Sequence, residues 1–578
     1  MTHNILKSDI LKAALAGVLT LGMASCTDDL KLSPIDPQSS QAYDDMSLLA
    51  KQYAVLGTTG QQGPAGKGDL SMDEGESGFY RTMFNLEELC TDECIWAWQH
   101  DDDIAPLTYI AWNKDSKRVS WTYSRLSYDI TQFNNFLTAN AEKTDGEWPH
   151  YLAEVRFLRA LHYYYFLDLF RKAPFADTYQ QGVMPEEKAG KDLYEWLDTE
   201  LTTIEGQLAE IGSYNNSQNF GRADQGAAYA LHARLALNSE VYTNGAIKDY
   251  QKAVDYCDLI IGSGKYELSK ATNVNGYTGY EQVFMGDNDQ NPQAMKEIIF
   301  PIRQDGTRTQ EYAGSTYLVS SMRIAGMPFC STNNCWSCNF ARHTLLKHFF
   351  NNPEKDMPHA TDDEVTELLK AKYDGKGSTA LTVDEVIDVD DELNITTADV
   401  IEKAKDDRAM FYTGVGGKIR SLSTKQITGF ENGASIVKWQ NRRSDNTEPS
   451  NEKFSDTDIP LFRLAEIYLT RAEALYRLGT DDAQALADLN QLRSRAKATE
   501  ATSIDLNILI DEWCKEFYME GRRRSDLVRF GMFTGNKYLW DFKGGEADGT
   551  SVDKKFNVYP IPTTDLSLNP NMHQNDGY

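Results

Sequence analysis

Apolar residues recur at helical spacing in several long stretches of the chain. Residues 154–170 place aromatic and leucine side chains three and four positions apart, which predicts a helix that ends before Pro174. Residues 226–261 and 458–496 each contain two segments of this kind. Each of the two stretches has about the length of one tetratricopeptide repeat, so we expect helix–turn–helix pairs. A further helix is expected over residues 509–530.

Polar residues mark where each pair would turn. The turns are expected at residues 242–245 and 480–482. In the first pair, Ala227, Ala230 and Ala233 recur at the spacing of one helix face. Side chains this small allow two helices to pack closely. The predicted helix at residues 509–530 differs, because it carries the basic run Arg522, Arg523, Arg524 near its end.

The stretches between the helical units have little helical period. Residues 57–80 are rich in glycine, residues 266–290 and 301–339 combine Gly, Asn and Thr with aromatic residues, and residues 357–395 are acidic. Long loops that interrupt a helical scaffold usually carry function. One repeat pair cannot bury its apolar face alone. We therefore expect a mostly α fold, in which tetratricopeptide-like helix pairs form a frame with a large loop-rich ligand-binding lobe.

The N-terminus has the pattern of a secretory signal peptide. Lys7 and Lys12 accompany a short apolar run, and the small residues Ala24 and Ser25 precede Cys26. A lone cysteine at this place is typical of a lipoprotein, so Cys26 is expected to be lipidated and to become the mature N-terminus. The lipid would anchor the protein to a membrane without making it span.

These observations give a domain plan with one folded domain after the signal peptide. The helical units lie on both sides of the loop region in the sequence, so the two are not expected to separate into domains. The plan consists of a signal peptide at 1–25, a single domain at 26–578, a frame at approximately 40–56, 120–265 and 455–535, and a lobe at approximately 57–119 and 266–454.

Charge and composition narrow the classes of function. The 578 residues include 58 Lys and Arg against 86 Asp and Glu, a formal net charge of −28. A nucleic-acid backbone requires a basic stripe, and none is present, so nucleic-acid binding is not expected. No apolar run reaches about 18 residues, so no membrane-spanning helix is expected. Seven cysteines follow Cys26, and this odd number implies at least one free thiol.

Common catalytic motifs are missing from the sequence. There is no GxSxG and no HExxH, and the stretch from Gly60 has the wrong spacing for a phosphate loop. No carboxylate pair stands out for glycoside hydrolysis. Cys330, Cys335, Cys338 and His343 have ligand types suited to zinc, although their order matches no common zinc motif. The alternatives are ordinary packing or one disulfide around a loop that presents Trp336.

Several segments together resemble the SusD family, the surface glycan-binding lipoproteins of Bacteroidetes. They are RALHYYYFLDLF, DIPLFRLAEIYLTRAEAL, EFYMEGRRRSDLVRFGMF and the tail YPIPTTDLSLNPNMHQNDGY. The resemblance covers essentially the whole mature chain. Within the family, DEGESGFYR, TDECIWAWQ, AGMPFCSTNNCWSC and FGMFTGNKYLWDFKGG resemble the starch-binding kind. The family fold is mostly α, with four tetratricopeptide-like pairs that support a loop-rich lobe.

The aromatic residues of the loops suit a sugar site on physical grounds. An oligosaccharide offers flat C–H faces that match aromatic rings and hydroxyl groups that match Asp, Asn and Arg. By the resemblance, Trp98, Tyr312 and Trp336 form an arc of rings that holds a helical glucan. Trp96 lies two residues before Trp98, so in an extended segment both would point to one face. Ordinary core packing is the alternative for each ring, most of all for Trp96.

The resemblance also implies the polar contacts of the site. They match Asp73, Arg81 and Asp101 in this chain. By the same resemblance, the starch-binding kind has Asn at this position, so Asp101 is a departure. Aspartate lacks the amide donor, so one hydroxyl contact must reverse or be lost. This places the strength of glycan binding in question more than its existence.

A structural calcium ion is a further implication. Asp287, Asp289 and Asn291 begin like an EF-hand loop, but Pro292 and Ile298 stand where the turn glycine and the bidentate Glu belong. Carboxylates from separate segments can still gather an ion. The resemblance implies a site that joins Asp289 to Asp456 and Asp458. The alternative for Asp458 is helix capping ahead of Pro460.

The sequence thus leads to a non-catalytic, lipid-anchored protein exposed at the outer-membrane surface. It would capture starch and malto-oligosaccharides, that is α-1,4-glucans, and deliver them to a TonB-dependent, SusC-like outer-membrane barrel, the partner that the family implies. The alternatives are a SusD-like protein that binds a different glycan, a tetratricopeptide-type scaffold without direct glycan binding, and a hydrolase with unrecognised carboxylates.

Overall fold

The computed structural model describes residues 44–60, 68–323, 331–359, 395–413, 422, 427 and 433–578. Residues Lys51–Tyr578 form one compact unit, and Met1–Ala50 form another, of which only the last residues fall in these ranges. The predicted signal peptide and Cys26 lie outside the described residues. No helix in the described ranges combines the length and apolar character needed to cross a bilayer.

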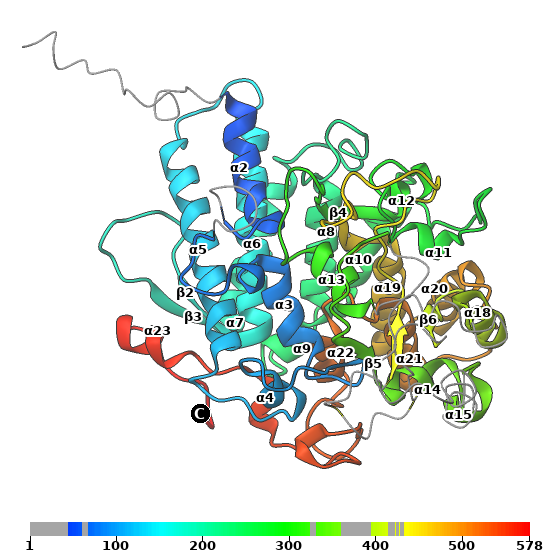
Figure 1. Cartoon of the computed structure of the whole chain (residues 1–578). Helices are drawn as coiled ribbons and strands as arrows, with labels where there is room; N and C mark the ends of the chain where they lie inside the picture. Colours follow the sequence, from blue (N-terminus) through cyan, green and yellow to red (C-terminus); the bar gives the residue numbers. More distant parts are fainter. Residues whose placement is uncertain are drawn as a thin grey trace, which may run out of the picture. The chain divides into compact units, whose positions relative to one another are not determined.

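A continuous series of helices forms the frame of the larger unit. Each helix packs against the next, and Figure 1 shows them following one another across the unit. The chain leaves this series after its fifth helix and returns only after the loop-rich lobe. The frame helices are α5 (Lys117–Ala139), α6 (Trp148–Phe170), α7 (Gly190–Glu205), α8 (Gln225–Leu237), α10 (Tyr250–Gly262), α19 (Leu464–Leu478) and α20 (Asp482–Arg495).

The two predicted helix pairs are confirmed, except that Ile459–Arg463, at the start of the second stretch, form a strand. Local chemistry explains the ends of the helices. Gly479 ends α19 in a left-handed conformation (φ 66°), which glycine adopts without steric cost. The Asp481 carboxylate then caps α20 by accepting the Gln484 N–H at 2.9 Å. In the first pair, Ala227 and Ala233 of α8 are fully buried. Their small side chains allow α8 to lie close to α10, as the alanine pattern predicted.

The lobe combines short helices with small antiparallel sheets. Its largest sheet has the strand order β1-β5-β7-β6. A second pairing joins β4 of the lobe to β8, which runs directly into α19 and so ties the lobe to the frame. The strands are β1 (Cys94–Trp96), β2 (Lys172–Phe175), β3 (Glu186–Ala189), β4 (Ile298–Ile302), β5 (Asn339–Ala341), β6 (Phe411–Tyr412), β7 (Ala434–Ile436) and β8 (Ile459–Arg463).

The remaining helices are mostly short. The α-helices are α2 (Asp45–Gly57), α3 (Phe79–Glu88), α4 (Ile104–Thr108), α9 (Ser239–Tyr242), α11 (Gly279–Gln282), α12 (Pro292–Glu297), α13 (Ser315–Met322), α14 (His343–Phe349), α15 (Pro353–Asp356), α18 (Thr397–Ala404), α21 (Leu506–Phe517), α22 (Arg523–Arg529) and α23 (Thr563–Leu568). The 3-10 helices are η1 (Glu74–Glu76), η3 (Lys543–Gly545) and η4 (Lys554–Asn557).

The prediction of one helix over residues 509–530 is wrong, because the chain breaks between α21 and α22. Met519 and Gly521 take left-handed conformations, with φ of 60° and 75°. The backbone N–H groups freed by the break are bonded by distant carboxylates. Glu93 accepts the Met519 N–H at 2.8 Å, and Glu88 accepts the Gly521 N–H at 2.6 Å. Two buried acids from another part of the chain therefore stabilise the break.

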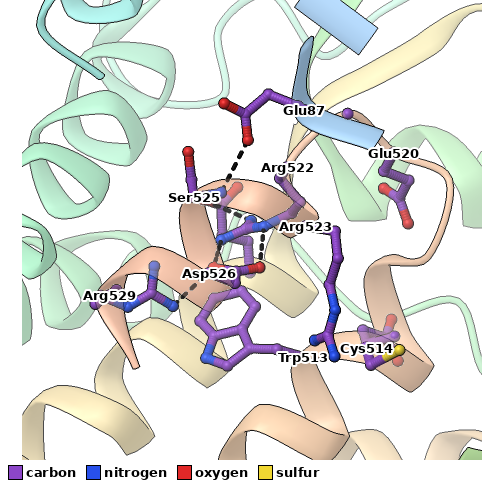
Figure 2. A network of polar contacts seen from close by, with 12 residues as sticks. Glu87, Trp513, Cys514, Glu520, Arg522, Arg523, Ser525, Asp526 and Arg529 are labelled. Atoms are coloured by element: carbon purple, nitrogen blue, oxygen red, sulfur yellow. Dashed lines mark hydrogen bonds and ion pairs between the residues drawn. The ribbon is translucent and has the colours of Figure 1, made fainter. Parts of the chain in front are cut away.

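The basic run at the start of α22 is buried rather than exposed. Arg523 makes a two-pronged ion pair with Asp92, with both N–O distances 2.8 Å. Arg522 and Arg529 both reach Asp526, at 3.0 and 2.7 Å (Figure 2). We call this set the α22 network: Arg522, Arg523, Asp526 and Arg529 with Asp92. It fastens the end of the frame to the segment after α3.

Candidate functional site

A pocket of about 460 Å³ opens in the lobe, and all six residues predicted to contact glycan line it. They come from three separate segments, around η1 and α3, around β1, and on either side of α13. The lining residues are Asp73, Glu74, Gly75, Glu76, Arg81, Trp96, Trp98, Asp101, Tyr312, Asn334, Trp336 and Cys338. The structure thus brings the predicted residues together, while their contact with a sugar stays a prediction.

Trp96 and Trp98 occupy different places in this pocket. Trp96 ends β1, is 4% exposed and stacks on Tyr317 with ring centroids 5.7 Å apart. Sheet pairing continues only to Ala97, whose N–H donates to the Cys338 carbonyl at 2.8 Å. The chain then turns, and Trp98 is 45% exposed. Trp96 therefore supports the pocket from the core, and Trp98 offers an exposed ring surface to a ligand.

Tyr312 and Trp336 form the opposite aromatic wall. Their ring centroids are 5.9 Å apart, and the ring planes meet at 52°. Phe454 supports Tyr312 from behind, at 5.2 Å between centroids. The backbone N–H of Trp336 donates to the Ser320 carbonyl of α13 at 2.9 Å. Because both rings are held by their surroundings, the wall is a fixed angled surface that fits a bent ligand better than a flat one.

Arg81 holds the loop of η1 in place. It is 6% exposed, and its Nη1 donates to the Gly75 carbonyl at 2.6 Å while its Nη2 pairs with Glu76 at 2.9 Å. Its guanidinium also lies 4.4 Å from the centroid of the Tyr317 ring. Arg118 binds Glu76 from the other side at 2.8 Å. Arg81 is thus a positioning residue for Asp73 and its neighbours as well as part of the lining.

Asp101 is oriented by the indole of Trp96. The Trp96 Nε1–H donates to Asp101 Oδ2 at 3.1 Å. The carboxylate can only accept, so its remaining capacity suits a ligand hydroxyl that donates. An asparagine here could accept the same indole N–H through Oδ1 and would present an NH₂ donor. The carboxylate of Asp101 therefore offers acceptors alone to a ligand, where an asparagine would also offer a donor.

Burial perturbs one acid next to the pocket. Glu311 precedes Tyr312 and is 2% exposed. Burial, aided by the charge of Glu74, raises its pKa to about 8, although the Ala313 N–H and Arg81 act in the opposite direction. Glu311 accepts the backbone N–H of Ala313. This acid therefore shapes the loop that carries Tyr312.

Sequence reasoning missed part of the lining. Glu74, Gly75 and Glu76 follow Asp73 directly, and Asn334 precedes Trp336 by two residues. Each stands inside a segment that already resembled the family, so proximity to a predicted contact was the available signal. Nothing in the local pattern distinguishes these residues from ordinary loop residues.

Two of the three aspartates of the implied calcium site, Asp289 and Asp458, contact Arg303. Its Nη2 lies 2.9 Å from Asp289 Oδ2, and its Nε lies 3.3 Å from Asp458 Oδ2. Asp458 is fully buried, and burial, with the charges of Asp289 and Asp456, raises its pKa to about 7 while Arg303 lowers it. Its Oδ2 accepts no hydrogen bond, because the contact with Arg303 lacks the required geometry.

The donor set fits calcium, since hard carboxylate oxygens are its usual ligands and Asp458 Oδ2 is a buried oxygen without a hydrogen bond. Asp456 has less capacity left for an ion, because its oxygens accept the backbone N–H groups of Gly306 and Ser450 at 2.8 and 2.7 Å. The helix-capping alternative for Asp458 is wrong. Asp458 and Pro460 lie at the start of β8, and α19 begins only at Leu464.

The possible zinc ligands do not assemble in the described residues. The Cys335 thiol donates to the Arg323 carbonyl, and His343 Nε2 lies 2.7 Å from Glu354. Cys330 lies outside the described ranges. The metal-ligating side chains that do come together there are Asp92, His348 and Cys514, within 4.8 Å of one another. Arg523 already binds both Asp92 oxygens, so these groups extend the α22 network.

A frame of stacked helix pairs that presents an aromatic pocket with hydroxyl-matching groups defines a helical-repeat protein with a carbohydrate-type site. The model of the SusD family matches residues 296–578. The chain is also 52% identical over 572 residues to starch-binding protein SusD of Bacteroides thetaiotaomicron, covering 98% of each chain. The protein therefore belongs to the SusD family, as the sequence resemblance indicated.

Solved structures agree on the fold. A SusD-like protein of Bacteroides fragilis superposes with a TM-score of 0.62 at 19% identity, over 93% of this chain and 97% of that one. Surface glycan-binding protein A of Bacteroides thetaiotaomicron, solved with laminarihexaose, gives a TM-score of 0.60 at 18% identity, over 92% and 98%. The expected mostly α, SusD-like fold is confirmed.

Proposed function

We propose that this protein binds starch and malto-oligosaccharides, that is α-1,4-glucans, and does not transform them chemically. The observation that carries this proposal is the pocket in which Trp98, Tyr312 and Trp336 meet beside Asp73, Arg81 and Asp101. The relative with 52% identity is named for starch binding, and its name describes no reaction. Binding without catalysis also agrees with the absence of a recognisable catalytic motif in the sequence.

The geometry explains how such a pocket would choose its ligand. An α-1,4-glucan curves, and its successive rings present inclined apolar faces, whereas a β-1,4-glucan is straight. Two aromatic planes that meet at 52° match inclined faces. Acceptors such as Asp101 and the amide of Asn334 lie beside the rings, where the hydroxyl groups of the sugar would be.

Calorimetric titration of the chain from Thr27 onward tests this function. We expect heat of binding with maltoheptaose and none with a β-1,4-glucan oligomer of similar length. Incubation with maltoheptaose should release no new reducing ends, which separates a binding protein from a hydrolase. Binding of the β-glucan alone would assign the pocket to a different glycan. Binding of neither would remove the glucan assignment.

The cellular setting extends the proposal. A lipid on Cys26 would anchor the protein at the outer face of the outer membrane, and a TonB-dependent, SusC-like barrel would receive the bound oligosaccharide for uptake. The signal-peptide pattern and membership of the family support this. In the source organism, Cys26→Ala should move the protein out of the membrane fraction. A tagged wild-type protein should co-purify with a large outer-membrane protein, and failure of either result would contradict the corresponding part.

A structural calcium ion is the second part of the proposal. Asp289 and Asp458 would hold it with the oxygens that now face Arg303, and Asp456 would add charge. Such an ion would join the segment before α12 to β8. Calcium should raise the midpoint of thermal unfolding relative to EDTA, and Asp458→Asn should abolish that difference. Equal midpoints for the wild type in calcium and in EDTA would contradict the site.

A further inference from the structure

Two carboxylates face the pocket without a cation beside them. Asp101 takes its one side-chain hydrogen bond from the neutral indole N–H of Trp96. Asp73 precedes η1 and is exposed to solvent. In the ranges that the structure describes, neither residue takes part in an ion pair. Asp73 is exposed, and Asp101 is partly exposed.

The guanidinium in the pocket lining is already engaged, and Lys453 lies outside the lining, 5.4 Å from the centroid of the Tyr312 ring. Among the described lining residues, the carboxylates are Asp73, Glu74, Glu76 and Asp101, and the guanidinium is that of Arg81. Arg81 pairs with Glu76, and its Nη1 donates to the Gly75 carbonyl. The Thr59 hydroxyl, a neutral group, donates to Glu74 at 2.8 Å. The lining therefore has a clear excess of negative charge.

We propose that this excess of negative charge restricts the pocket to uncharged glycans, and that Asp101 is the residue that enforces the restriction most strongly. The inference rests on the proposed function, since it concerns which glycans the same pocket accepts. A neutral sugar hydroxyl can donate a hydrogen bond to a carboxylate, but a uronate or a sulfate cannot. An anionic sugar in van der Waals contact with Asp101 would bring two like charges within a few ångströms.

Asp101 should act more strongly than Asp73 because of its surroundings. It is partly buried against Trp96, and the indole N–H fixes one of its oxygens. A charge next to aromatic walls is less screened by water than a charge on an exposed loop. An aspartate at this position thus repels anions, whereas an asparagine could donate a hydrogen bond to them.

The experiment compares two ligands that have the same chain length and linkage and differ in charge. One is maltoheptaose, and the other is the same oligosaccharide with its C6 hydroxymethyl groups oxidised to carboxylates. For the wild type we expect the oxidised ligand to bind at least about tenfold more weakly at low salt, in line with like-charge repulsion at contact distance. In 1 M NaCl the ratio of the two affinities should move towards one, because the Debye length falls to about 3 Å and the repulsion that acts through solvent weakens.

Two variants locate the effect. Asp101→Asn should bring the affinity ratio several-fold closer to one, and Asp73→Asn should do so less. Asp102→Asn is the matched control, because Asp102 lies outside the lining and pairs with Lys117 at 2.7 Å on the surface. The control removes the same charge and should leave the ratio unchanged.

Three results would overturn the inference. The first is equal binding of both ligands by the wild type. The second is a ratio that neither salt nor Asp101→Asn changes, which would mean that the oxidised groups are excluded by their shape. The third is an equal change in Asp102→Asn. Failure of the wild type to bind maltoheptaose at all would instead overturn the proposed function, and the inference with it.

Discussion

The α22 network and the glycan pocket are built from the same residue types and use them in opposite ways. Arg523 is 2% exposed, and its Nε and Nη2 both donate to Asp92. Trp513 beside it is 1% exposed, and its indole N–H donates to Glu473 at 2.7 Å. In the pocket, Trp98 is 45% exposed, and Asp101 has no cationic partner in the described ranges.

The extent to which a side chain is buried and bonded therefore distinguishes structural residues from ligand-binding residues better than the residue type does. Burial by itself raises the pKa of Asp92, yet Arg523 and His348 outweigh it and hold that pKa well below the usual range. Both oxygens of such a carboxylate are already bonded within the protein, so it has no capacity left to bind a ligand. Capacity that is left over, such as an exposed ring surface or a carboxylate oxygen open to solvent, marks the binding site.

Removal of Arg523 should have the largest effect on stability. Arg523→Ala leaves Asp92 charged and buried without its partner, which should cost about 3–5 kcal/mol of the free energy of unfolding. Chemical denaturation measures this directly. Arg308→Ala is the control, because the Arg308 side chain is 86% exposed. Equal stability of the two variants would mean that the α22 network does not fasten the fold.

Removal of Trp98 should break binding and spare the fold. Trp98→Ala removes an exposed ring surface, so we expect a loss of affinity for maltoheptaose of about 2 kcal/mol or more, roughly 30-fold. The unfolding midpoint should change little. Tyr179→Ala is a matched control, since Tyr179 is 42% exposed and lines a different groove. A large loss of stability in Trp98→Ala would show that Trp98 supports the fold, as the residues of the α22 network do.

Glu311 should have an effect on stability that is small at pH 5 and grows as the pH rises. Its pKa is about 8 in the folded protein, against an ordinary value of 4.5 for a glutamate in an unfolded chain. Between these values the folded state binds the extra proton, so its contribution to stability is complete below about pH 4.5 and is lost as pH rises through 8. Glu311→Gln should therefore stabilise the protein relative to wild type at pH 8 by about 1–4 kcal/mol more than at pH 5.

Denaturation at the two pH values tests this, with Glu195→Gln as the control because its side chain is 53% exposed. A difference between wild type and Glu311→Gln that is the same at both pH values would show that Glu311 does not titrate in this range.

Local periodicity predicted the frame well and the junctions poorly. The helix expected over residues 154–170 is the larger part of α6. It ends at Arg171, which takes a left-handed conformation (φ 57°) and lies shortly before Pro174. The break after α21 was missed. Its stability depends on Glu88 and Glu93, which lie more than 400 positions away in the sequence, and no local pattern contains such information.

The pocket could not be derived from spacing for the same reason. Trp98 and Tyr312 are separated by most of the frame and part of the lobe in sequence, and only the tertiary fold brings them to one cavity. The family resemblance identified these residues together, because members of the family share the fold that brings such residues to one pocket. It did not supply the burial of Arg523 and Arg524, because a run of basic residues in the sequence looks like an ordinary exposed helix end.

The packing of α10 on α19 has a consequence for how the protein is made. The two helices are neighbours in space, but the whole second part of the lobe separates them along the chain. Until the chain has been synthesised or exported beyond residue 478, the outer face of α10 has no partner. A nascent chain would carry an open apolar edge for that time, which slows folding and invites association with other chains. A chaperone in the export pathway would find its target there.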